Sequence, residues 1–187
     1  MGGAFTSSMV SLVIGGARSG KSRFAQSLAA HSEKVAYLAT ARFEDAEMAE
    51  RIARHRLERP AHWVTVEEPL EIGSAVARHA VDYDVILLDC LTIWLSNFSW
   101  EHREIETASL HAAASREVAR MTAAVGAAHL VVVTNEVGCG LVPESPVGRL
   151  FRDLQGWVNQ DIARRADWVY HLVAGIAVPI KRPGDCL

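Results

Sequence analysis

Short apolar runs alternate with longer stretches of helical period along most of this chain. Four apolar runs, at 10–14, 35–40, 85–89 and 129–134, predict strands that are buried on both faces of a sheet. Residues 62–67 alternate between apolar and polar side chains as a half-buried strand does. Near the carboxyl end, residues 168–181 supply one last strand, or a hairpin pair that turns near Gly175.

The intervals between these strands carry the signals of helices. Apolar spacing, caps and stop residues predict helices over residues 23–30, 44–59, 69–81, 104–125 and 147–166. Strands that alternate with helices predict an α/β fold, with a mainly parallel sheet and helices on both of its faces. Residues 1–8 are expected to form a flexible leader, and residues 9–187 a single domain.

The stretch from residue 91 to residue 103 fits neither pattern. It contains Trp94, Phe98 and Trp100 without a clear period. Core packing is the default use of such side chains, but three large rings in an irregular stretch also suit a subunit interface or the pocket of a large substrate. We assign the segment to an interface or a substrate pocket.

The strongest chemical signal is the turn between the first predicted strand and the first predicted helix. It reads Gly15-Gly16-Ala17-Arg18-Ser19-Gly20-Lys21-Ser22, which matches the phosphate-loop pattern in the strand–loop–helix context that the pattern requires. Glycines let successive backbone N–H groups converge on phosphate oxygens. Lys21 can reach the outer phosphates and the Ser22 hydroxyl can bind Mg²⁺. The loop predicts a nucleoside triphosphate site and a P-loop NTPase-like fold.

A second signal is the acid that ends the strand at 85–89. Four buried-strand residues followed by Asp89 resemble a Walker-B strand, whose carboxylate lies beside the phosphate loop and binds Mg²⁺. Ligands in such sheets bind at the carboxyl ends of the strands. The phosphate loop, Asp89 and the turn at 134–140 are therefore expected at one edge.

A third candidate is His55, which lies among arginines. On a helix Arg51 and Arg59 flank it at i−4 and i+4, and nearby positive charge keeps an imidazole neutral and nucleophilic while offsetting phosphate charge. The same pattern also fits a solvated basic face with one semi-buried histidine. The residues alone leave both interpretations open.

Composition narrows the possible partners. The chain has 187 residues, of which 50% are hydrophobic and 22% charged, and a net charge of −3, which gives no reason to expect nucleic acid as a partner. Its apolar runs are all shorter than a membrane span. The three cysteines lack metal-ligand spacing, and their odd number fits the reducing cytoplasm.

Several motifs together resemble one family. The phosphate loop is followed by Arg51-Ile52-x-x-His55-Arg56-x-x-Arg59-Pro60-x-x-Trp63-x-Thr65-x-Glu67, then by Thr134-Asn135-Glu136-Val137-Gly138-x-Gly140-x-Val142-Pro143, Phe151-Arg152-Asp153 and Val158-Asn159-Gln160. In this order they resemble the bifunctional adenosylcobinamide kinase / adenosylcobinamide-phosphate guanylyltransferase family of cobalamin biosynthesis. The resemblance covers nearly everything after the leader.

The resemblance implies two reactions and a set of site residues. The first reaction phosphorylates adenosylcobinamide with ATP or GTP, and the second transfers GMP from GTP through a guanylylated histidine at the position of His55. The resemblance also implies Mg²⁺ as the metal ion, a corrinoid substrate and a homotrimer. Nucleotide contacts are implied at the phosphate loop and at Ala39, Thr40, Ala41, Arg56, Leu57, Glu58, Arg59, Glu67 and Asp89. The family commonly has Ser where this chain has Ala41, so a side-chain contact is not expected there.

Two other functions remain open. The chain could be a phosphate-loop kinase for another small alcohol, with His55 structural. It could also be a nucleotide-binding switch protein, although Thr134-Asn135-Glu136-Val137 lacks the Lys and Asp of a GTPase guanine-recognition motif.

Overall fold

A computed structural model describes residues 8–42 and 59–185, and the strands of this part form one sheet. Its order is β3-β2-β4-β5-β1-β6-β7. The strands are β1 (Met9–Gly15), β2 (Val35–Ala39), β3 (Val64–Glu67), β4 (Val85–Asp89), β5 (His129–Asn135), β6 (Trp168–Val173) and β7 (Ile176–Lys181). Neighbouring strands are parallel, except for the antiparallel pair β6 and β7. The mainly parallel α/β sheet is confirmed.

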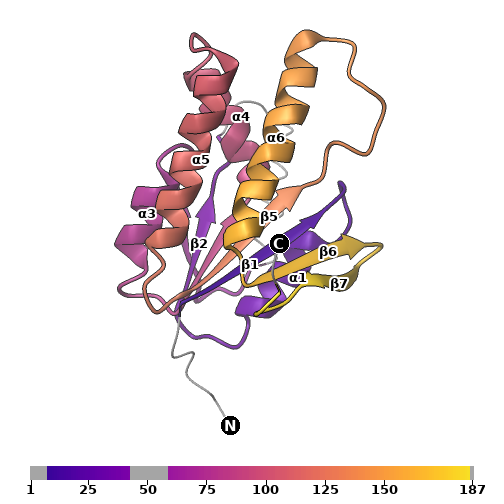
Figure 1. Cartoon of the computed structure of the whole chain (residues 1–187). Helices are drawn as coiled ribbons and strands as arrows, with labels where there is room; N and C mark the ends of the chain where they lie inside the picture. The colour runs from indigo at the N-terminus through magenta and orange to yellow at the C-terminus, as the bar shows by residue number, and fades with distance from the viewer. Residues whose placement is uncertain (1–7, 43–58, 186–187) are drawn as a thin grey trace.

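Helices cover both faces of this sheet, as expected. The helices are α1 (Lys21–Ala29), α3 (Ile72–His79), α4 (Leu91–Glu101), α5 (Thr107–Ala123) and α6 (Pro146–Arg165). Helices α3 to α6 pack on one face, and α1 lies on the other (Figure 1). Because successive strand residues point to opposite faces, Leu12 enters the first core and Val13 the second. Both side chains are fully buried, which explains why the central strands are mostly apolar on both faces.

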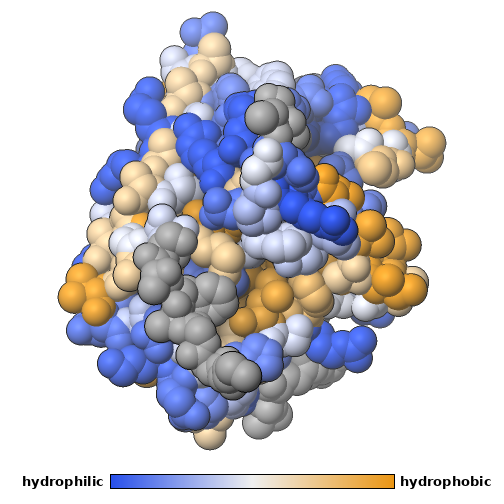
Figure 2. All heavy atoms as spheres, turned by 60° about the horizontal axis from the view of Figure 1, so that its bottom comes forward, coloured by the Kyte–Doolittle hydropathy of each residue, from blue (hydrophilic) through white to orange (hydrophobic). Residues whose placement is uncertain are grey.

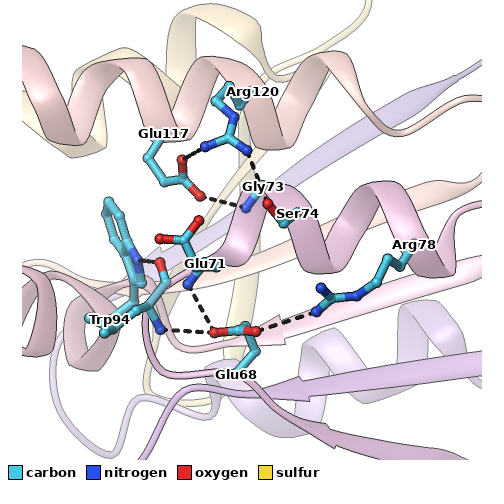
Figure 3. A network of polar contacts seen from close by, with 9 residues as sticks. Glu68, Glu71, Gly73, Ser74, Arg78, Trp94, Glu117 and Arg120 are labelled. Atoms are coloured by element: carbon cyan, nitrogen blue, oxygen red, sulfur yellow. Dashed lines mark hydrogen bonds and ion pairs between the residues drawn. The ribbon is translucent and has the colours of Figure 1, made fainter.

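The assignment of residues 91–103 as irregular is wrong, because residues 91–101 form helix α4. The helix packs against the sheet and against α5 and α6, so apolar side chains surround it and no apolar stripe stands out. Trp94 is fully buried and donates its indole N–H to the Leu70 carbonyl at 2.8 Å (Figure 3). Phe98 packs beside it. Trp94 and Phe98 are core residues, and only Trp100 is exposed, at 67%.

The sequence predicts that a helix begins at Pro69, but helix α3 begins at Ile72. The backbone N–H groups before it are bound by the Glu68 carboxylate, which accepts from Leu70 and Glu71. The Gly73 N–H at the start of the helix donates to Glu117 of α5 at 2.8 Å (Figure 3). These carboxylates supply the N-terminal cap that no residue of α3 itself provides.

The remaining elements follow the sequence closely. The predicted hairpin is present as β6 and β7, joined by a turn at Ala174–Gly175 in which both residues have positive φ. The helix expected over residues 44–59 lies outside the described residues apart from Arg59. Within residues 8–42 and 59–185, no helix is long and apolar enough to cross a membrane.

Candidate active site

The phosphate loop joins β1 to α1 at the carboxyl edge of the sheet. Gly20 has φ +95°, and its carbonyl accepts the Phe24 N–H as the helix begins. Lys21 is only 8% exposed and donates from Nζ to the Gly16 carbonyl at 2.6 Å. Burial lowers the pKa of Lys21, and the nearby Cys90 and Asp89 act in the opposite direction. The loop therefore curls around the side chain of its own lysine.

The loop is packed tightly against its neighbours. A Cβ at Gly15 would lie 2.5 Å from the Leu172 carbonyl oxygen of β6 and 2.8 Å from Ser19 Oγ, so no larger residue fits there. The buried Ser19 hydroxyl has no hydrogen-bond partner among the described residues. A buried hydroxyl without a partner is costly, and a phosphate oxygen at the loop would satisfy it.

Asp89 ends β4, and its surroundings tie it to the loop. Strand β5 lies between β4 and β1, so the strand that ends in Asp89 is not adjacent to the strand that precedes the loop. Its charge nevertheless raises the pKa of Lys21 against the larger effect of burial, so the two groups are near enough to interact. Asp89 Oδ2 accepts a 2.7 Å hydrogen bond from the Tyr37 hydroxyl. The expectation that Asp89 belongs with the phosphate loop is consistent with this geometry.

Three other expected site residues lie at the same edge. Strand register places Ala39 directly between Glu67 of β3 and Asp89 of β4. Glu67 is exposed, whereas Thr40 is fully buried. The Thr40 hydroxyl donates to the Cys90 carbonyl at 2.8 Å and accepts the Cys90 N–H at 3.0 Å. Thr40 therefore fixes the backbone that follows Asp89, and a nucleotide contact from its side chain remains a prediction.

Arg59 lies at the same edge, against Tyr37 of β2. Its guanidinium lies over the Tyr37 ring, 3.5 Å from the centroid, and Nη1 donates to Thr65 Oγ1 at 3.2 Å. The Tyr37 side chain thus contacts Arg59 through the face of its ring and Asp89 through its hydroxyl. The expected residues His55, Arg56, Leu57 and Glu58 lie outside the described residues.

Sequence reasoning missed the polar network behind the loop. The Thr134 hydroxyl donates to Asn159 Oδ1 at 2.8 Å and accepts from Gln155 Nε2 at 3.1 Å. Asn159 Nδ2 then donates to the Asn135 carbonyl, and the Glu136 N–H donates to the Gly15 carbonyl at 3.0 Å. These bonds fix the end of β5 against the phosphate loop. The sequence signal was available, since polar residues ending an apolar strand and on a buried helix face need mutual partners.

The side chains present fit Mg²⁺. Asp89 offers a carboxylate and Ser22 a hydroxyl near the start of α1, and Mg²⁺ prefers such oxygen ligands. Among the described residues, no group of three or more His, Cys, Asp or Glu side chains could hold a metal ion. A site of one or two protein ligands completed by substrate phosphates is the usual arrangement for Mg²⁺ in phosphoryl-transfer enzymes.

A parallel sheet with a phosphate loop after β1 and an acid ending β4 defines an α/β protein of the P-loop NTPase-like class. The sequence profile described as "Cobinamide kinase / cobinamide phosphate guanyltransferase" matches residues 11–180. The chain belongs to this family.

Curated relatives agree with this assignment. The "Bifunctional adenosylcobalamin biosynthesis protein CobU" of Escherichia coli (strain K12) is 41% identical over 181 residues, which cover 92% of this chain and 100% of that protein. The CobU protein of Salmonella typhimurium gives the same figures. The "Bifunctional adenosylcobalamin biosynthesis protein CobP" of Pseudomonas aeruginosa is 41% identical over 176 residues, covering 92% of this chain and 98% of the relative.

Proposed function

We propose that this protein is a bifunctional enzyme of cobalamin biosynthesis. It phosphorylates adenosylcobinamide with ATP or GTP. It then transfers GMP from GTP to adenosylcobinamide phosphate through guanylylated His55, giving adenosylcobinamide-GDP. Family membership supports both reactions. The observation that carries the proposal is the position of Asp89, which accepts a hydrogen bond from Tyr37 beneath Arg59 and acts electrostatically on Lys21 of the phosphate loop.

In the kinase step the chain's role is to position the phosphates and neutralise their charge. The loop N–H groups and the start of α1 face the phosphates, and Lys21 exchanges its bond to the Gly16 carbonyl for phosphate oxygens. Ser22 and Asp89 would hold Mg²⁺, which would supply further positive charge to the phosphates. The substrate hydroxyl attacks the γ-phosphorus and gives up its proton to solvent. Its oxygen–phosphorus bond forms as the bond from the γ-phosphorus to the bridging oxygen breaks, and the nucleoside diphosphate leaves.

The guanylyl step needs a nucleophile from the protein. His55 attacks the α-phosphorus of GTP, a nitrogen–phosphorus bond forms, and pyrophosphate leaves. A phosphate oxygen of adenosylcobinamide phosphate then attacks the same phosphorus, and the nitrogen–phosphorus bond breaks. Arg59, four residues after His55, contributes positive charge at the edge where Asp89 lies. The surrounding nucleotide contacts are proposed to come from Ala39, Thr40, Ala41, Arg56, Leu57, Glu58 and Glu67.

Labelled GTP separates this proposal from its rivals. With Mg²⁺ and α-labelled GTP, the protein should retain label as a phosphoramidate, labile in acid and stable in alkali, whereas γ-label should leave with pyrophosphate. His55→Ala should abolish α-labelling and guanylyl transfer but largely spare phosphorylation of adenosylcobinamide. The matched control is His62→Ala, because His62 is an exposed histidine. The His62→Ala protein should still take up the α-label. Full labelling of His55→Ala would remove the nucleophile assignment.

We also propose a cytoplasmic homotrimer. Apolar side chains exposed on the antiparallel hairpin favour self-association, and those on the edge strand β7 are Ile176 (67%), Val178 (47%) and Ile180 (61%). Figure 2 shows apolar surface gathered toward the right of the view, the side on which β6 and β7 lie in Figure 1. The free Cys90 and Cys139 suit a reducing compartment. Sedimentation equilibrium would test the trimer, and a monomer at micromolar concentration would contradict it.

A further inference from the structure

Tyr37 occupies an unusual position for a polar side chain. It lies in β2 on the α1 side of the sheet, only 1% exposed, among Val35, Leu87 and Val133. A phenol buried among aliphatic side chains costs free energy unless its hydroxyl finds a partner. The partner is Asp89 on the adjacent strand, at 2.7 Å. Packing alone would be served by phenylalanine, so the hydroxyl has a use beyond the core.

The bond has a defined direction. The Tyr37 hydroxyl is the donor, because an ionised carboxylate can only accept a hydrogen bond. Asp89 Oδ2 accepts this hydrogen bond, and the described residues make no hydrogen bond to the other carboxylate oxygen. A carboxylate anchored through one oxygen presents the second in a fixed direction. This second oxygen, unbonded by the described residues, is the one suited to a metal ion.

The ring of Tyr37 makes a second, independent contact. Arg59 stacks on its face at 3.5 Å, and the Thr65 hydroxyl holds Arg59 Nη1 from the other side. A guanidinium that is already ordered against an aromatic ring loses less conformational freedom on binding a ligand than one that moves in solvent. Arg59 follows His55 by four residues in the sequence, and these contacts fix Arg59 itself at the edge where Asp89 lies.

We propose that Tyr37 is a positioning residue shared by the two reactions, orienting Asp89 toward the metal through its hydroxyl and seating Arg59 on its ring. The proposal rests on the proposed function, because it assigns Asp89 to Mg²⁺ and Arg59 to the guanylyl step. It goes beyond that function in naming one buried side chain through which both groups are held.

Two substitutions separate the hydroxyl from the ring. Tyr37→Phe keeps the ring beneath Arg59 and removes only the bond to Asp89. We expect the Mg²⁺ concentration for half-maximal rate to rise about five- to tenfold in both reactions, with kcat at saturating Mg²⁺ largely retained. Tyr37→Leu removes both contacts and should additionally slow α-labelling of the protein relative to the kinase rate.

The main readout does not depend on turnover. Binding of Mn²⁺ to the protein with a non-hydrolysable GTP analogue, followed by electron paramagnetic resonance, should weaken by a similar factor in Tyr37→Phe. The matched control is Tyr170→Phe, because the Tyr170 hydroxyl makes no hydrogen bond to the described residues and its ring contacts Phe24. This control should bind Mn²⁺ as the wild type does.

The outcomes are distinct. Unchanged Mn²⁺ affinity in Tyr37→Phe would overturn the proposal, and so would a lower melting temperature as its only effect. Equal loss in Tyr37→Phe and Tyr170→Phe would do the same. If the wild type bound Mn²⁺ and nucleotide but took up no α-label and phosphorylated no corrinoid, the proposed function would fail while the role of Tyr37 toward the metal remained tested.

Discussion

Gly20→Ala tests how closely the β6–β7 turn supports the phosphate loop. Gly20 has φ +95°, which alanine adopts only under strain, and an added Cβ would lie 3.1 Å from the Gly175 Cα. The neighbouring Ser19 carbonyl accepts the Gly175 N–H at 2.9 Å. The substitution therefore acts on the loop in two ways, through its own backbone and through the turn packed against it.

The expected size follows from these two terms. A non-glycine residue in this region costs about 1–3 kcal/mol, and the close contact with backbone atoms adds to it because a strand turn cannot move aside as a side chain can. The loop can relieve both by shifting away from the turn, which misaligns the N–H groups that bind phosphate. Because about 1.4 kcal/mol corresponds to a tenfold change in affinity, nucleotide binding should weaken about 10- to 100-fold.

Titration with a fluorescent GTP analogue gives the affinity, and a thermal melt gives the stability. The matched control is Gly126→Ala, in the turn between α5 and β5, where φ is +58° and a Cβ would meet nothing within 4 Å. That variant should lose about 1 kcal/mol of stability and bind nucleotide normally. Wild-type affinity in Gly20→Ala, or an equal loss in both variants, would refute the reasoning.

Four further predictions follow from single groups. Lys21→Ala should slow both reactions by about 3 kcal/mol or more in transition-state free energy, measured as kcat/KM, and near-normal turnover would contradict the loop assignment. Asp89→Asn should weaken Mg²⁺-dependent turnover with little change in melting temperature, whereas an equally large loss of stability would indicate a structural acid. Trp94→Ala should cost about 3–5 kcal/mol of unfolding free energy in urea, but Trp100→Ala less than about 0.5, and equal effects would contradict their opposite burial. Burial lowers the pKa of His129 to about 4 against the opposing charge of Asp167. The unfolded chain therefore takes up a proton first as the pH falls from about 6.5 to about 4. Stability should decline there by up to about 3 kcal/mol, and urea unfolding of His129→Gln should show a flatter pH dependence.

Local sequence determined most of the described elements of this protein and indicated the chemistry of its candidate site. Apolar runs fixed the strands because a strand covered on both faces needs apolar side chains at every position. The phosphate loop was recognisable because its function depends on backbone conformation over a few consecutive residues, which Gly15, Gly20 and Lys21 encode directly. The mainly parallel sheet followed from the alternation of strands and helices.

Tertiary structure decided what the elements do to one another. Helix α4 was not recognised from the sequence because neighbouring elements surround it and leave no apolar stripe. Its Trp94 lies in the core and not at an interface or pocket. Strand order, which no local pattern encodes, places β5 between the loop strand and Asp89. Only the folded chain brings Tyr37 between Asp89 and Arg59, and the turn at Gly175 against the loop. These contacts join residues far apart in sequence, so the pattern around any one of them carries no trace of its partner.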